Sequence, residues 1–186
     1  MERGTSDKTL LDEFVLDFVK IVENHCKYII VSGYVVISHG RSRATEDVDM
    51  ILERIPKEKF VALHNDILKS GFECMQSKSG EEVYTQYLEN NTSVRYTRKG
   101  SMIPEMEVKL SKDELDDEQL ITRKKLGLTG LDVYFSSIEM NIAFKEELLK
   151  SDKDLEDARH LRIVYEDELD ESEIKKIKGM IRRLRL

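Results

Sequence analysis

The most constraining feature of this sequence is the segment Asp47–Leu52, DVDMIL, in which two aspartates alternate with apolar residues. Such alternation is typical of a β-strand that is buried on one face only. Because Asp is disfavoured in strands, two of them in one short strand require a reason. Residues two apart on a strand point to the same side, so we expect the carboxylates of Asp47 and Asp49 to lie together while Val48 and Met50 face the core.

Two neighbouring carboxylates repel each other, and without a counter-charge one of them takes up a proton. A divalent cation removes this conflict, and Mg²⁺ is typically bound by one or two carboxylates together with substrate phosphates. The pair therefore predicts a Mg²⁺ (or Mn²⁺) site for phosphate chemistry, which a third carboxylate on a neighbouring strand would complete. We expect this carboxylate from Glu107 in the predicted strand EMEVKL, because Glu107 lies deeper in the apolar context than Glu105.

A turn with small residues precedes the aspartate strand. Ser32 and Gly33 end the β-branched run KYIIVSG, and we expect them to contact phosphate, since glycine permits close backbone approach and a following helix start offers free N–H groups. Arg41 and Arg43, in the intervening loop, are expected to offset phosphate charge or to lie exposed and hold the loop. Taken singly, the turn and the aspartates also fit an ordinary turn and a solvated strand face.

Helix and strand patterns alternate along the chain before a run of helices at its end. The predicted fold class is α+β, a mixed β-sheet flanked by helices, with a core over residues 1–135 and a helical segment over 136–186 that packs on the core or extends from it. The expected helices cover 8–25, 57–69, 112–127, 136–150, 151–165 and 172–184, and capping-box patterns predict that three of them begin at Ser111, Ser136 and Ser151.

Composition narrows the class of protein. A net charge of -7 over 186 residues argues against a general nucleic-acid binder. No run approaches the roughly 18 apolar residues of a membrane span, and the first residues do not resemble a signal peptide. Cys26 and Cys74 have no metal-site or disulfide spacing, so we expect reduced thiols in a cytoplasmic protein without a membrane partner. The histidines have no metal-ligand spacing and are assigned no catalytic role.

The turn at Ser32-Gly33 followed by Asp47-Val48-Asp49-Met50 resembles the first signature of the nucleotidyltransferase superfamily, which has a polymerase-beta-like fold. The loop HGRSRATED is especially similar to the prokaryotic AbiEii-toxin-like branch. A second segment, IAFKEELLKSDKDLEDARHL, resembles later motifs of that group. The resemblance implies that Lys145 contacts the triphosphate and that Asp154, or its neighbour Asp157, belongs to the last motif in an acceptor-side or positioning role.

These two later residues also have structural interpretations that the sequence leaves open. Lys145 fits an exposed helix lysine, and Asp154 fits the carboxylate of a helix cap. The chain also departs from the usual superfamily pattern. The turn is Ser-Gly where Gly-Gly or Gly-Ser is usual, and Glu107 stands where Asp is more common.

The resemblance implies an ATP-binding type of enzyme that transfers a nucleoside monophosphate from an NTP to an acceptor hydroxyl with two Mg²⁺ ions. Asp47, Asp49 and Glu107 would be its catalytic metal ligands. The acceptor would be an RNA end such as that of tRNA, a small molecule or a protein, and a toxin-like member would have an antitoxin-like protein partner. The alternative is a catalytically weak or inactive nucleotide-binding protein of the same fold that acts through protein partners. A third interpretation is an interaction domain whose charged residues are all on the surface.

Overall fold

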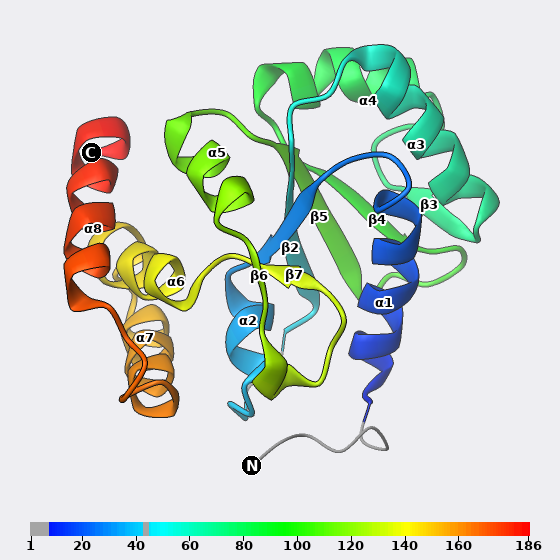
Figure 1. The fold of residues 1–186 in the computed structure, drawn as a ribbon. Coiled ribbons are helices and arrows are strands. Elements are labelled where there is room, and N and C mark those ends of the chain that lie inside the picture. Colours follow the sequence, from blue (N-terminus) through cyan, green and yellow to red (C-terminus); the bar gives the residue numbers. More distant parts are fainter. Residues whose placement is uncertain (1–7, 43–44) are drawn as a thin grey trace.

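The computed structural model describes residues 8–42 and 45–186. Its centre is a mixed sheet of seven strands in the order β3-β4-β5-β2-β1-β7-β6 (Figure 1). The aspartate strand β2 (Asp47–Leu52) is central, antiparallel to β1 (Tyr28–Val31) and parallel to β5 (Glu105–Leu110). The outer strands are β3 (Phe72–Cys74), β4 (Val94–Arg98), β6 (Lys124–Lys125) and β7 (Tyr134–Phe135).

Helices flank the sheet in two groups (Figure 1). One group comprises α1 (Leu10–Val22), α3 (Lys57–Lys69) and α4 (Gly80–Gln86). The other comprises α5 (Glu114–Ile121), α6 (Ile138–Phe144), α7 (Asp152–Val164) and α8 (Glu171–Arg185). The short α2 (Gly33–Ser38) joins β1 to β2, and single turns lie at η1 (Leu88–Asn90), η2 (Gly127–Thr129) and η3 (Lys145–Leu149). The predicted α+β class, with a mixed sheet and helices at the C-terminal end, is confirmed.

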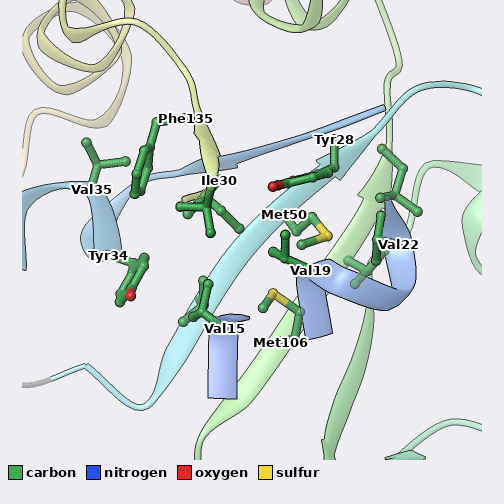
Figure 2. Packing of buried hydrophobic residues seen from close by; sticks show 14 of the residues in the cluster. Val15, Val19, Val22, Tyr28, Ile30, Tyr34, Val35, Met50, Met106 and Phe135 are labelled. Carbon is green, nitrogen blue, oxygen red and sulfur yellow. The ribbon is translucent and has the colours of Figure 1, made fainter. Parts of the chain in front are cut away.

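The two faces of the sheet differ in character. Figure 2 shows Ile30, Met50 and Met106, from three adjacent strands, packed on the same side as Val15 and Val19 of α1. These strand residues are fully buried. Because side chains alternate along a strand, the residues between them face the opposite side of the sheet. The hydrophobic face therefore fixes which residues of β1, β2 and β5 lie on the second face.

A much smaller hydrophobic cluster lies on the second face, made by Ile29, Ile51 and Leu120 with Val31 against it. This cluster leaves the start of β2 and β5 without an apolar cover among the described residues. The second face is thus divided into a small apolar part and a polar part, and the polar part carries Asp47 and the residues that follow it in register.

The C-terminal helices share the main core with the sheet. One hydrophobic cluster contains Phe135, Ile142, Leu161 and Ile177, which lie on both sides of the predicted boundary at residues 135 and 136. That boundary stays a prediction. Charged pairs add to the packing of α8, which contacts α5 and η3 through the pairs Arg185–Asp113 at 2.8 Å, Arg185–Asp116 at 2.8 Å, Lys178–Glu146 at 2.6 Å and Arg182–Glu147 at 2.9 Å.

Two predicted helix starts are wrong by one or two residues. Helix α5 begins after Asp113, whose carboxylate accepts hydrogen bonds from two backbone N–H groups, and not after Ser111. Helix α6 begins after Ser137 and not after Ser136, whose hydroxyl instead donates to Gln119 at 2.9 Å. In both places two good capping residues compete, and tertiary contacts decide between them. The predicted start at Ser151 is confirmed.

The predicted helix over residues 112–127 is also too long. It ends at Ile121, and Lys124–Lys125 pairs with β7 as the edge strand β6. Both cysteines are free thiols, Cys26 buried and Cys74 half-buried. No helix within residues 8–42 and 45–186 has the length and apolar character needed to cross a membrane.

Truncation of Phe18 tests the packing of the main core. Phe18 is 0% exposed, and its ring centroid lies 5.2 Å from that of Phe72 and 5.5 Å from that of Tyr96. We expect Phe18→Ala to lower the free energy of unfolding by about 3 to 5 kcal/mol in urea denaturation. Leu10→Ala, in the same helix at 83% exposure, should change it by less than about 0.5 kcal/mol. Equal effects of the two substitutions would contradict this packing.

Candidate active site

The two aspartates of β2 lie on the polar part of the second face, as predicted. Val48 and Met50 are fully buried, while Asp47 is exposed and Asp49 is half-buried. Asp49 lies opposite Val31 of β1 on one side and opposite Glu107 of β5 on the other. The burial of the two apolar residues therefore holds both carboxylates on the same side of a rigid central strand.

The turn before α2 has an unusual backbone. Ser32 has φ 66° and ψ -132°, a conformation that side-chain-bearing residues rarely adopt and that is most often retained at functional sites. Its side chain does not cap the helix, but hydrogen-bonds to Asp49. A polar hollow of about 220 Å³ lies at this turn. Its wall comes from the turn, from β2 and the residue Thr45 before it, and from α7. The lining residues are Ser32, Gly33, Thr45, Asp47, Asp49, Lys153 and Asp154.

The electrostatics of Asp49 match the repulsion expected from the sequence. Burial raises the pKa of Asp49, and the negative charges of Glu107 and Asp47 raise it further. The Lys109 ammonium and the hydrogen bond from Ser32 act in the opposite direction without cancelling the rise in pKa. A carboxylate that is held among other carboxylates in this way is stabilised in its charged form by a bound cation.

Glu107, the predicted third carboxylate, has a partner that the sequence reasoning missed. Arg95 of β4 lies directly opposite it in register. The Arg95 Nη2 atom is 3.2 Å from Glu107 Oε2, and its Nε atom is 3.2 Å from Glu105 Oε2. The alternation of charge in VRYTR and EMEVKL could have indicated this cross-strand pair.

Acidic side chains are therefore not gathered into a preformed metal centre. Across the described ranges, no group of three or more His, Cys, Asp and Glu side chains is arranged to hold a metal ion. The pair Asp47 and Asp49 fits Mg²⁺ nonetheless, because Mg²⁺ needs only one or two carboxylates when phosphate oxygens supply other ligands. The assignment of Asp47, Asp49 and Glu107 as metal ligands stays a prediction.

Lys145 is buried rather than exposed, with 1% of its surface accessible. It opens η3, a π-helical turn, a feature that often occurs at functional sites. Its Nζ atom lies 2.9 Å from Asp157 Oδ2 and 3.3 Å from Asp154 Oδ1. Asp154 also takes part in the N-terminal cap of α7, where its backbone N–H donates to Ser151 Oγ at 3.1 Å. Asp154 therefore belongs to the N-terminal cap of α7 and also lines the polar hollow.

Asp157 has a larger role than the sequence indicated. It is fully buried and accepts hydrogen bonds from both Lys145 and Arg41. Arg41 also binds Glu156, with Nη2 and Oε2 2.7 Å apart, so it attaches the loop before β2 to α7. We call Arg41, Lys145 and Asp157 the buried charge cluster. Arg43, the other predicted loop arginine, lies outside the described residues.

A second cavity, also of about 220 Å³, lies beside the polar hollow and shares Ser32 and Asp49 with it. Much of its wall is apolar, and its polar lining includes Lys109, Asn141, Asp116 and Arg185. No pattern in the sequence indicates this cavity, because its wall comes from strands β1, β2 and β5 and from helices α5, α6 and α8, which only the tertiary structure brings together.

Neutralisation of Asp49 tests the carboxylate repulsion. Because its pKa is raised on folding, the stability linked to its protonated form is present below the ordinary pKa of 3.8 and is lost as the pH rises through the folded value. In EDTA, Asp49→Asn should therefore unfold at higher urea concentration than the parent at pH 7, and the difference should disappear in acid. Asp167→Asn, at an exposed position, should show no such pH dependence. A less stable Asp49→Asn at pH 7 would contradict the repulsion.

The buried charge cluster is tested with two carboxylates that both contact Arg41. Asp157→Asn leaves Lys145 and Arg41 without their buried partner and should lower the free energy of unfolding by about 3 to 5 kcal/mol. Glu156 is 62% exposed in its side chain, so Glu156→Gln should cost less than about 1 kcal/mol. Thermal and urea unfolding measure both. A small effect of Asp157→Asn would show that the cluster does not stabilise the fold.

Comparison with known proteins shows which solved structures have a similar fold. No protein-family model and no curated protein matches the sequence. A crystal structure of an antigenic nucleotidyltransferase-like protein from Paracoccidioides brasiliensis matches with a TM-score of 0.52 and 18% identity, covering 93% of this chain and 88% of that one.

The antibiotic-resistance factor ANT(2'')-Ia also matches. Its solution structure has a TM-score of 0.55 and 12% identity, over 93% of this chain and 91% of that one. Its crystal structure with adenylyl-2''-tobramycin has a TM-score of 0.55 and 16% identity, over 94% and 98%. At such identities the likeness concerns the fold. The chain has a nucleotidyltransferase-like fold.

Proposed function

We propose that this protein is a nucleotidyltransferase, which moves a nucleoside monophosphate from an NTP to an acceptor hydroxyl. The observation that carries the proposal is the position of Asp47 and Asp49, which share one polar hollow with the strained turn at Ser32 and Gly33. Paired carboxylates beside a turn that leads into a helix suit a triphosphate with its Mg²⁺. The likeness of the fold to nucleotidyltransferases supports the same activity.

In the proposed complex, the triphosphate occupies the polar hollow with its phosphates near Ser32, Gly33 and the Lys153 side chain. Asp47 and Asp49 hold Mg²⁺, which when bound neutralises the triphosphate and lowers the pKa of the acceptor hydroxyl. Asp154 faces the same hollow from α7. Because Lys145 is compensated by two carboxylates, we assign it the positioning of Asp154 and α7 rather than a phosphate contact through a free charge. Arg41 likewise positions the loop before β2.

In the transfer step, the acceptor oxygen attacks the α-phosphorus of the NTP and forms the new P–O bond. The bond between the α-phosphorus and the oxygen bridging to the β-phosphate breaks, and pyrophosphate leaves with those electrons. The acceptor proton passes to the carboxylate of Glu107, which lies opposite Asp49 in the sheet. The pair with Arg95 engages Oε2 of Glu107, so Oε1 is the atom we assign as proton acceptor.

The proposal also includes the sequence-based expectations for the acceptor, the protein partner and the cellular location. The presence of adenylyl-2''-tobramycin in the ANT(2'')-Ia structure supports a small-molecule hydroxyl as the first acceptor class to test. An RNA end or a protein hydroxyl, the AbiEii-toxin-like branch, an antitoxin-like partner and a cytoplasmic location stay predictions from the sequence.

One observation favours a second candidate function. The ion pair between Arg95 and Glu107 compensates the carboxylate that would take the proton. If this pair makes Glu107 too weak a base to accept the proton through Oε1, the protein binds an NTP without transferring it and serves as a nucleotide-binding regulatory subunit. Arg95→Met separates the two candidates, because it frees Glu107 and should raise the rate of pyrophosphate release only if Arg95 restrains catalysis.

Calorimetry with the four non-hydrolysable NTP analogues tests nucleotide binding. We expect Mg²⁺-dependent binding of at least one analogue, and a loss of affinity of at least about tenfold in Asp47→Asn and in Asp49→Asn, since each removes one charged ligand. Asp167→Asn should bind as the parent does. Pyrophosphate release from the matching NTP with an acceptor identifies an enzyme, and binding without release identifies the regulatory candidate. Binding that needs neither aspartate would overturn both.

A further inference from the structure

Among the described residues that line the second cavity, Lys109 is the cation that forms no salt bridge. Arg185, in its wall, binds Asp113 and Asp116, each at 2.8 Å, and Lys145 binds Asp154 and Asp157. Lys109 also lines the cavity and is half-buried. No salt bridge or hydrogen bond joins its side chain to any residue in the described part of the chain, and its charge acts on the nearby Asp49, whose pKa it lowers. We call this space the Lys109 cavity.

The rest of the lining is largely apolar. Met140, Phe144, Leu148 and Val31 contribute to its wall. A half-buried ammonium beside such a surface binds an anionic group more strongly than an exposed lysine does, because the lower local dielectric strengthens the attraction. The volume of about 220 Å³ is below the roughly 300 to 1,000 Å³ typical of sites for drug-sized ligands. The cavity therefore suits a small molecule with an apolar body and an anionic group.

The sheet register relates this cavity to the reacting atoms. In the pairing of β2 with β5, Glu107 lies opposite Asp49 and Lys109 lies opposite Ile51. Lys109 is thus two residues further along β5 than Glu107. Lys109 and Glu107 therefore project on the same side, roughly 6.6 Å apart along the strand. The cavity also shares Ser32 and Asp49 with the polar hollow. A molecule bound to Lys109 can thus present a hydroxyl group at the junction of the two spaces, beside Asp49, the residue that lies opposite Glu107 in the sheet.

We propose that the Lys109 cavity binds the acceptor, and that this acceptor is a small, largely apolar molecule carrying a hydroxyl group and a carboxylate or phosphate group that Lys109 recognises. The inference rests on the proposed nucleotidyl transfer and specifies its acceptor. Lys109 is then a specificity-determining residue, which excludes polycationic acceptors by charge repulsion. The carboxylate partners of Arg185 and Lys145 are already engaged. Among the described lining residues this leaves a polycation only Asp49, which the proposed metal requires.

Three phenols that share a two-carbon side chain and end in an anionic, a neutral or a cationic group test the proposal by calorimetry without nucleotide. They are 3-(4-hydroxyphenyl)propionate, its neutral amide and tyramine. In a further arm, hydroxyphenyl phosphates provide a phosphate group in place of the carboxylate. We expect the anionic probes to bind at least about tenfold more tightly than the amide, with tyramine weakest. Lys109→Met should abolish this order and Lys109→Arg should retain it. Lys99→Met, at an exposed position, should bind as the parent does, and thermal unfolding checks that every variant is folded.

The outcomes separate the acceptor inference from the proposed function. Equal binding of the three phenols, no binding of any, or a charge preference that survives Lys109→Met overturns the inference even if Mg²⁺-NTP binding is intact. If Lys109→Met weakens the NTP analogue and leaves the phenols unchanged, Lys109 contacts the triphosphate and the inference is likewise overturned. If the anionic probes bind through Lys109 but no NTP binds, the cavity assignment holds and the nucleotidyl-transfer proposal fails. Label transfer from an NTP to total tRNA that does not depend on Lys109 would also contradict the acceptor inference.

Discussion

The placement of Asp47 and Asp49 on one face of the central strand is the constraint around which the candidate site is organised. The chain places both carboxylates on one face of its central strand because Val48 and Met50, between and after them, are fully buried on the other. Neither carboxylate can leave this face without exposing an apolar neighbour. The pKa of Asp49 is raised by burial first and by Glu107 and Asp47 as well, so the folded chain holds this carboxylate where its charged form is disfavoured. Proteins that store such unfavourable energy at one place commonly use it for binding.

The surroundings of the pair hold it in place from two sides. On one side, the Ser32 turn keeps an unfavourable backbone conformation and hydrogen-bonds to Asp49. On the other, the buried charge cluster of Arg41, Lys145 and Asp157 joins the loop before β2 to α7. A buried ion pair of this kind contributes more to a specific arrangement than to net stability, because desolvation offsets much of its attraction. The helices at the C-terminal end thus form part of the site through Asp154 and Lys145.

The sequence predicted those parts of the structure that depend on local pattern. The alternation in DVDMIL located β2 with its correct bounds and assigned its two faces, and the pattern in EMEVKL did the same for β5. It could not decide between adjacent capping residues such as Ser136 and Ser137, where contacts from elsewhere select one. It also missed Arg95, whose pairing with Glu107 depends on strand register, and it ranked Asp157 below Asp154, because burial of a charged residue depends on partners distant in sequence. The Lys109 cavity lay beyond prediction for the same reason.

The most direct test of the account is the position of a divalent cation and a triphosphate in crystals grown with Mn²⁺ and a non-hydrolysable NTP. The account predicts anomalous density for Mn²⁺ about 2 Å from carboxylate oxygens of both Asp47 and Asp49, with phosphate oxygens completing the coordination beside Ser32 and Gly33. Manganese bound elsewhere, or a triphosphate that lies outside the polar hollow while both aspartates remain unligated, would contradict it.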